Sequence, residues 1–320
     1  MPGFEFIRSL GHAVDEFPVH TKALLEEERQ RSRTAKDGQT SRSIISQLLQ
    51  ASADSEKGEG LTEEETVGNI FIFAVAGFDT TANTLSSALV LLARYPKWQN
   101  WLQEEIDRLL PPNLTSEEVD YASVFPQATR MLAFLFGVLR LYTALIHITK
   151  QTRTPQTLKT SQGEKWLPAN VTIYINCVAL HLDPAVYRNI NLPHAGKESE
   201  TDELSFRPTA RWLNPSGSPQ TFFQPPKGSF VPWSAGPRIC PGQKMAQVEF
   251  TAVLMMPLRR HRLEAVPLKD EKDDATAVYE RLERRMRDSV SILTLQMNDV
   301  YDLADGGEGA GIPLRLSKRE

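Results

Sequence analysis

The feature that most constrains the fold is a long segment without proline between residues 62 and 96. Thr62 and Glu65 have the spacing of a capping box, in which two side chains bond backbone N–H groups at a helix start. Because proline is the residue that breaks helices most strongly, the segment predicts one helix of about 33 residues, or about 50 Å. Residues 70–78 are apolar on nearly all sides of that helix, which is typical of burial inside a large protein.

A transmembrane helix is the alternative explanation of this apolar run. The middle of the segment, however, carries one charge and four other polar side chains, namely Asp79, Thr80, Thr81, Asn83 and Thr84. A charge at the centre of a bilayer costs several kcal/mol. We therefore expect no membrane span in this chain. The first ten residues also lack the basic and apolar regions of a signal peptide.

The composition fits a globular protein and excludes several other classes. The 36 basic and 40 acidic side chains give a net charge of −4, which lacks the positive footprint of a nucleic-acid binder. Hydrophobic residues make up 41% and charged residues 24%, which excludes a disordered or collagen-like chain. Two cysteines are too few for a disulfide scaffold and favour a reducing compartment, so we expect a cytoplasmic location.

The remaining patterns predict a mainly helical protein with a small sheet fraction. Strands are expected over residues 170–177 and 312–316, a coil-like stretch over 189–232 and a glycine loop over 306–311. Helical patterns cover residues 4–28, 42–53, 96–110, 126–142, a segment after Pro241, and 277–297.

The segment from Pro232 to Glu249 (PWSAGPRICPGQKMAQVE) places a cysteine in a Gly/Pro-rich loop directly before a predicted helix. A helix N-terminus and a nearby cation such as Arg238 favour the thiolate form of a cysteine. One thiolate suffices to bind iron where a porphyrin supplies four nitrogens. The alternative is that Cys240 is a free cysteine packed in a core. The crowding of glycine and proline favours a flat cofactor lying on the backbone.

These residues resemble the haem-binding loop of cytochrome P450 monooxygenases, in the pattern Trp233-x-x-Gly236-x-Arg238-x-Cys240-x-Gly242. Three more segments resemble that family in the same order along the chain. They are residues 76–81 (AGFDTT, the oxygen-activation motif), 139–142 (LRLY, the second half of the Glu-x-x-Arg motif) and 206–212 (FRPTARW, the Arg-bearing meander). The resemblance covers roughly residues 40 to 265, in the style of eukaryotic and particularly fungal members.

The resemblance implies haem b as the cofactor and Cys240 as the axial ligand of its iron. Arg238 would contact a haem propionate, with Trp233 and Gly242 in the same loop. His147 falls where family members often place another propionate contact, although a lone histidine in an apolar strand is more often a structural partner.

Two residues of the long helix are implied in catalysis. Asp79 and Thr80 would deliver protons to oxygen bound at the iron. The alternative is that threonine hydroxyls bond back to the carbonyl four residues earlier and only bend the helix. Both roles are compatible.

The resemblance also implies that the family's membrane anchor, early helices and sheet should precede residue 1. Residues 1–320 would then form a single partial domain, the C-terminal portion of the cytochrome P450 fold. Apolar surface of the long helix would face water. Full-length members are usually anchored at the endoplasmic reticulum membrane.

The family's motif glutamate, which joins Arg140 and Arg211 in one buried network, falls at Gly137. With no carboxylate between them, two cations would share a poorly solvated site. Removing one partner of a buried charge cluster costs about 3–5 kcal/mol, and a mid-helix glycine adds about 1 kcal/mol. We therefore expect a weakly active or inactive chain that loses haem easily, and we expect Gly137→Glu to stabilise it.

The leading hypothesis is a haem-thiolate monooxygenase that inserts one atom of O₂ into a small organic substrate, in fungal secondary metabolism. Its electrons would come from an NADPH-cytochrome reductase. One alternative is a truncated, catalytically inactive member of the same family. Another is a helical binding protein without haem.

Overall fold

A computed structural model describes residues 2–34, 43–53, 60–111, 113–188, 202–213, 221–268, 271, 274–291, 293–297 and 311–319. The chain divides into two compact units, Met1–Phe78 and Asp79–Glu320. Helix α3 (Glu63–Arg94) continues from the first unit into the second. That all residues form one partial domain stays a prediction.

The first unit contains α1 (Pro2–Thr34), α2 (Ile44–Ala53) and the first half of α3. The predicted capping box of α3 is confirmed, because the Thr62 N–H donates to Glu65 Oε2 at 2.9 Å and the Glu65 N–H to Thr62 Oγ1 at 3.2 Å. The burial that is typical of an apolar run is not observed over residues 71–78, which are exposed, as the resemblance implied for this surface. Ile72 is 59% exposed and Phe78 is 77% exposed.

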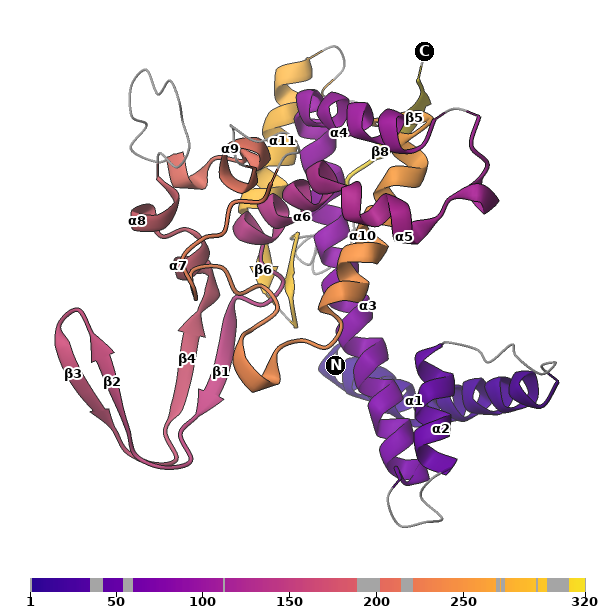
Figure 1. Ribbon diagram of the computed structural model, residues 1–320, viewed down its shortest axis with the longest axis vertical. Coiled ribbons are helices and arrows are strands. Elements are labelled where there is room, and N and C mark those ends of the chain that lie inside the picture. Colours follow the sequence, from indigo (N-terminus) through magenta and orange to yellow (C-terminus); the bar gives the residue numbers. More distant parts are fainter. Residues whose placement is uncertain are drawn as a thin grey trace. The chain divides into compact units, whose positions relative to one another are not determined.

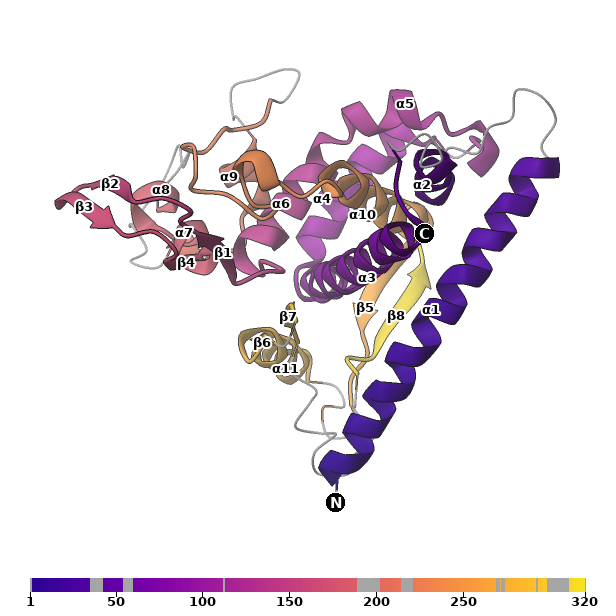
Figure 2. The same cartoon turned by 90° about the horizontal axis from the view of Figure 1, so that it is seen from below.

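The second unit is built around packed helices. Figures 1 and 2 show α4 (Pro96–Leu109), α6 (Thr129–Leu141) and α10 (Gln243–Leu258) lying beside one another. Leu92, Leu102, Phe134 and Leu254 are fully buried in the core that these helices and α3 share. The shorter helices are α5 (Tyr121–Val124), α7 (Cys177–His181), α8 (Pro184–Tyr187) and α9 (Pro208–Trp212), and α11 (Ala275–Arg287) follows later in the chain.

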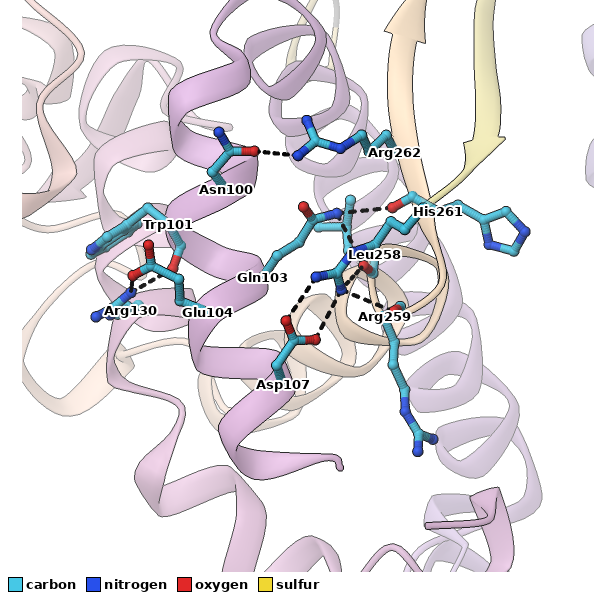
Figure 3. Close-up of polar contacts among 11 residues, drawn as sticks. Asn100, Trp101, Gln103, Glu104, Asp107, Arg130, Leu258, Arg259, His261 and Arg262 are labelled. Carbon is cyan, nitrogen blue, oxygen red and sulfur yellow. Dashed lines mark hydrogen bonds and ion pairs between the residues drawn. The ribbon is translucent and has the colours of Figure 1, made fainter. Parts of the chain in front are cut away.

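Polar side chains of α4 form hydrogen bonds to the end of α10, to β5 and to the start of α6. Gln103 Nε2 donates to the carbonyl oxygens of Leu258 at 3.2 Å and His261 at 3.0 Å (Figure 3). The buried Glu105 carboxylate accepts the N–H groups of Arg130 at 2.9 Å and Met131 at 3.0 Å. These N–H groups belong to the first turn of α6 and have no partner inside their own helix. Glu105 therefore caps α6 from a neighbouring helix.

The described strands form two-stranded antiparallel sheets. Strand β1 (His147–Gln151) pairs with β4 (Thr172–Asn176), and β2 (Gln156–Thr160) pairs with β3 (Gly163–Leu167), as Figure 1 shows. The other pairs are β5 (His261–Ala265) with β8 (Leu314–Lys318), and β6 (Val290–Ser291) with β7 (Leu295–Gln296). The mainly helical fold with small sheets is thereby confirmed.

One predicted helix is wrong in its second half. The pattern over residues 277–297 predicts a continuous helix, whereas α11 ends at Arg287 and Val290–Ser291 pairs with Leu295–Gln296 as β6 and β7. The sequence of this segment (VSILTLQ) includes three β-branched residues, which favour a strand. The predicted strands over 170–177 and 312–316 are confirmed as β4 and, shifted by two residues, as β8. Most of the predicted glycine loop and much of the predicted coil lie outside the described residues.

Among the described residues, no single helix is long and apolar enough to cross a membrane. One bent pair, Tyr121–Gln127 with Thr129–Leu141, has sufficient length and apolar character when taken together, with a bend of 60° between its parts. Much of its second helix, α6, is buried in the core.

Candidate functional site

Residues 231–242, here called the cysteine loop, form a tight turn in front of α10. The Cys240 N–H donates to the Trp233 carbonyl oxygen at 2.9 Å, and the Ile239 N–H donates to the Gly236 carbonyl oxygen at 3.1 Å. Gly236 has a φ of +81°, a left-handed conformation that glycine adopts without strain. The loop therefore folds back on itself and places Cys240 three residues before the first residue of α10.

The two cysteines of the chain lie in opposite environments. Cys240 is exposed, whereas Cys177 is buried and its Sγ is 3.7 Å from the Ile175 carbonyl oxygen. Burial raises the pKa of the Cys177 thiol above its usual value. Thiolates are the form that binds metals, so burial of this kind disfavours ligation. The core-packed alternative is therefore wrong for Cys240 and describes Cys177.

The cysteine loop fits a flat ligand such as a porphyrin. A Cβ added to Gly236 would meet no atom within 4 Å, so the space beside this turn is open. A Cβ added to Gly242 would lie 3.7 Å from Cys240 Sγ, so position 242 lies directly beside the thiol. The apolar side chain of Ile239 is 49% exposed next to the thiol. A single open thiol flanked by apolar surface and the exposed Arg238 is a suitable donor set for haem iron.

Trp233 and Lys150 have contacts at this loop, and for His147 the described contact is with the neighbouring strand. The Trp233 ring packs against Phe136 of α6, with ring centroids 6.1 Å apart. His147 is exposed and its ring contacts Tyr174 of the adjacent strand at 5.3 Å. Lys150, which lies on the opposite face of β1, donates to Ser234 Oγ of the loop at 3.4 Å. Lys150 therefore joins β1 to the cysteine loop, a contact that no local sequence pattern indicates.

Asp79 is held in a small polar cluster on the second half of α3. Its Oδ2 accepts a hydrogen bond from Thr294 Oγ1 at 2.5 Å, and its Oδ1 accepts one from Asn83 Nδ2 at 3.3 Å. Asn83 Nδ2 also donates to Thr294 Oγ1 at 2.9 Å. Thr294 is buried between β6 and β7, and its partnership with Asp79 spans 215 residues of sequence, which no local pattern could indicate.

The expected hydrogen bond from a threonine hydroxyl to the carbonyl four residues earlier is made by Thr84, one turn after Thr80. Thr84 Oγ1 donates to the Thr80 carbonyl oxygen at 2.8 Å, which is the bond to a carbonyl four residues earlier that bends helices. No described hydrogen bond or ion pair joins Asp79 to the cysteine loop. The structure therefore describes two separate groups, Cys240 with its loop and Asp79 with its cluster.

Arg140 contradicts the expectation of an unsatisfied cation. It is 1% exposed, and its guanidinium donates to the carbonyl oxygens of Glu203 at 2.5 Å, Ser205 at 2.9 Å and His181 at 3.3 Å. It also lies over the ring of Tyr187 at 5.3 Å from the centroid. Backbone carbonyl oxygens thus serve Arg140 where the resemblance implied a carboxylate. Arg211 lies in α9, and its side chain is outside the described part of the structure.

Gly137 faces an aromatic ring and not a gap. A Cβ at this position would lie 3.0 Å from Phe206 Cε2 and 3.5 Å from Pro208 Cβ. The Phe206 ring is itself packed against Tyr95, Trp98 and Phe134. A glutamate at position 137 would therefore have to displace a ring that three other rings hold in place. This packing argues against the expected stabilisation by Gly137→Glu.

An acidic side chain that the sequence analysis overlooked lies close by. The Glu203 carboxylate accepts two hydrogen bonds at 2.8 Å from Arg188 Nε and Nη2, a bidentate geometry that adds strength and direction. Its backbone carbonyl oxygen is one of the acceptors of Arg140. Glu203 therefore joins the segment before α9 to both α8 and α6.

Comparison with known proteins gives consistent results. The cytochrome P450 family model matches residues 5–278. The phomenoic acid biosynthesis cluster cytochrome P450 monooxygenase of Leptosphaeria maculans is 44% identical over 84% of this chain and 47% of its own length. Cytochrome P450 monooxygenase 124 of Postia placenta is 30% identical over 83% of this chain and 47% of its own length. The chain spans about half the length of these curated relatives.

A solved structure shares the fold. The crystal structure of a cytochrome P450, CYP102L1, superimposes with a TM-score of 0.67 and 20% sequence identity. The match covers 98% of this chain and 58% of that chain.

Proposed function

Because this chain belongs to the cytochrome P450 family, we propose that it is the thiolate-bearing part of a haem monooxygenase that inserts one atom of O₂ into a small organic substrate. The observation that carries the proposal is Cys240, an exposed thiol on an open glycine turn at the start of α10. The family implies a haem cofactor, and we propose haem b. A thiolate ligand pushes electron density onto haem iron and favours O–O cleavage.

The residues of this chain have distinct proposed roles toward that cofactor. Cys240 would hold the haem iron through its thiolate, with Gly242 beside the thiol and the Trp233 carbonyl oxygen holding the Cys240 N–H. Arg238 and His147 are the proposed partners of the haem propionates.

Proton transfer is assigned to α3. Asp79, through its carboxylate, and Thr80, through its hydroxyl, are the proposed pair that would hold and pass protons during the reaction. The hydrogen bonds from Thr294 and Asn83 fix the orientation of the Asp79 carboxylate, and general acid–base groups of this kind typically contribute roughly 10²–10⁴-fold to rate.

The proposed electron donor is an NADPH-cytochrome reductase, and the proposed setting is fungal secondary metabolism in the cytoplasm. The named role of the Leptosphaeria maculans relative in a phomenoic acid biosynthesis cluster supports that setting. We propose no nucleic-acid partner. We also retain the proposal that residues 1–320 belong to one partial domain of the family.

The test is the absorption spectrum of the purified chain loaded with haem, reduced and exposed to CO. We expect a red-shifted Soret band, its loss in Cys240→Ser, and its retention in Cys177→Ser. Loss of the band in Cys177→Ser alone would refute the assignment of the ligand. No haem binding would support the binding-protein alternative, whereas a normal band without turnover would support the inactive family member.

A further inference from the structure

His181 lies where α6, α7 and the cysteine loop meet. The residue is 0% exposed and is the last residue of α7. Its Nε2 accepts the N–H of Val231 at 2.9 Å, and its carbonyl oxygen accepts Arg140 Nη1 at 3.3 Å. Because a backbone N–H can only donate, Nε2 carries no proton and the imidazole is neutral.

A series of hydrogen bonds continues from His181 to the thiol-bearing residue. The Ser234 N–H donates to the Val231 carbonyl oxygen at 3.0 Å, which closes the first turn of the cysteine loop. The Cys240 N–H then donates to the Trp233 carbonyl oxygen at 2.9 Å. A displacement of Val231 would therefore be passed through the loop to Cys240.

The residues just before Val231 are held at the same place. The Phe230 ring lies 5.0 Å from the His181 ring and 4.5 Å from the Trp212 ring. Tyr187 Oη donates to the Ser229 carbonyl oxygen at 3.3 Å. The start of the cysteine loop is thus surrounded by rings, and the Val231 N–H is buried among them and needs an acceptor.

We propose that His181 is a positioning residue, whose neutral imidazole holds the start of the cysteine loop and so sets where Cys240 Sγ lies relative to the haem. The inference rests on the proposed haem-thiolate function. It assigns to His181 a role that links Arg140 to the cysteine loop through one residue, whose backbone carbonyl oxygen binds Arg140 and whose imidazole binds Val231. Position 137 of this chain offers no carboxylate.

The protonation state of His181 supports this role. Burial is the main reason why the pKa of His181 is lowered to about 4, and the positive charge of Arg140 lowers this pKa further. The backbone at Leu139 raises the pKa in part, although Nδ1 makes no hydrogen bond of regular geometry. The acceptor at Nε2 is therefore available throughout the neutral range.

The experiment compares His181→Gln, His181→Asn and His181→Leu at neutral pH, with exposed His20→Gln as the control. A glutamine side-chain oxygen can take the place of Nε2, whereas asparagine is one methylene shorter and leucine has no acceptor. We expect at least a fivefold loss of haem per protein in the Asn and Leu variants. Part of the Soret band of the remaining CO-bound haem should lack the red shift that thiolate ligation causes. The Gln variant should regain most of the wild-type band.

A second measurement reads the loop without haem. In the haem-free protein, we expect amide hydrogen exchange in peptides covering residues 229–240 to be at least tenfold faster for Asn and Leu than for wild type and Gln. If Leu fails to fold, the comparison of Gln with Asn decides, because both are polar and differ only in reach.

Each outcome has one meaning. Equal spectra and equal exchange across the series would overturn the inference, as would equal losses in Gln and Asn, which would indicate packing alone. If the wild-type chain binds no haem through thiolate, the proposed function fails and the ligand-positioning claim fails with it. A normal wild-type band with unchanged variants would overturn only the role of His181.

Discussion

Thr294 donates a hydrogen bond to Oδ2 of Asp79 across 2.5 Å and thereby joins the hairpin of β6 and β7 to the second half of α3. Because Asn83 occupies Oδ1 of the same carboxylate, neither oxygen can turn away without breaking a bond to a neighbour. The hairpin and the proposed proton-transfer acid are therefore mechanically linked.

Replacing Thr294 by valine tests this link. The change keeps the shape but removes the donor, and a hydrogen bond to a charged group contributes about 1.5–3 kcal/mol. We expect a lower melting temperature and, if the chain turns over, a higher ratio of peroxide to product per reduced nicotinamide consumed. Thr294→Ser keeps the hydroxyl and should stay near wild type. Equal peroxide ratios in Val and Ser would contradict the link.

The packing of Phe206 on Gly137 predicts the effect of adding a side chain there. Gly137→Ala gains about 1 kcal/mol in helix propensity, but overpacking of a supported ring costs about 1–3 kcal/mol. We expect Gly137→Ala to lower the melting temperature slightly and Gly137→Glu to lower it more. In a Phe206→Leu background, Gly137→Ala should instead stabilise. A rise in melting temperature for Gly137→Ala in the wild-type background would refute this packing argument.

The buried His181 predicts a defined pH dependence of stability. Burial lowers its pKa from 6.5 to about 4, so the unfolded chain binds more protons between these values. Its contribution to the free energy of unfolding is present above pH 6.5 and is lost as pH falls toward 4. Denaturant titrations from pH 7 to pH 4 should show a smaller decline for His181→Gln than for wild type. Parallel declines would show that other groups control the acid range.

The cap that Glu105 provides for α6 should be expensive to remove. Glu105→Ala leaves two backbone N–H groups without their acceptor, and each buried unsatisfied group costs about 1–3 kcal/mol. The control is Asp107→Ala on the same helix, whose bidentate pair with Arg319 lies at the surface and is worth about 0–1 kcal/mol. Chemical denaturation should separate the two variants clearly. Similar losses would mean that α6 is fixed by apolar packing alone.

The parts of the fold that could be predicted are those with local causes. The α3 capping box, the proline that begins α4 and the glycine turn around Cys240 each act within a few residues, and each is present in the structure. The motifs also singled out Cys240, Asp79 and Arg140, since motif spacing is a property of sequence, and the roles assigned to these residues stay predictions.

The parts that escaped prediction depend on contacts between distant segments. Thr294, His181 and Glu203 became significant only when the chain brought them to Asp79, Val231 and Arg140. The short hairpin of β6 and β7 lies where the continuous pattern predicts the second half of a helix, although its β-branched residues favour a strand. The hydrogen-bond partners of Arg140 could not be predicted from a motif, because a motif specifies side chains and these acceptors are backbone carbonyl oxygens.

That last feature has a bearing on how this part of the protein can change over evolutionary time. A carbonyl oxygen is identical in every amino acid, so the acceptor at position 205 survives whichever side chain replaces Ser205. The arginine itself has no such freedom, because only its planar fork reaches three acceptors at once. We therefore expect substitutions at Ser205 to have little effect on these hydrogen bonds, whereas a substitution of Arg140 would remove all three.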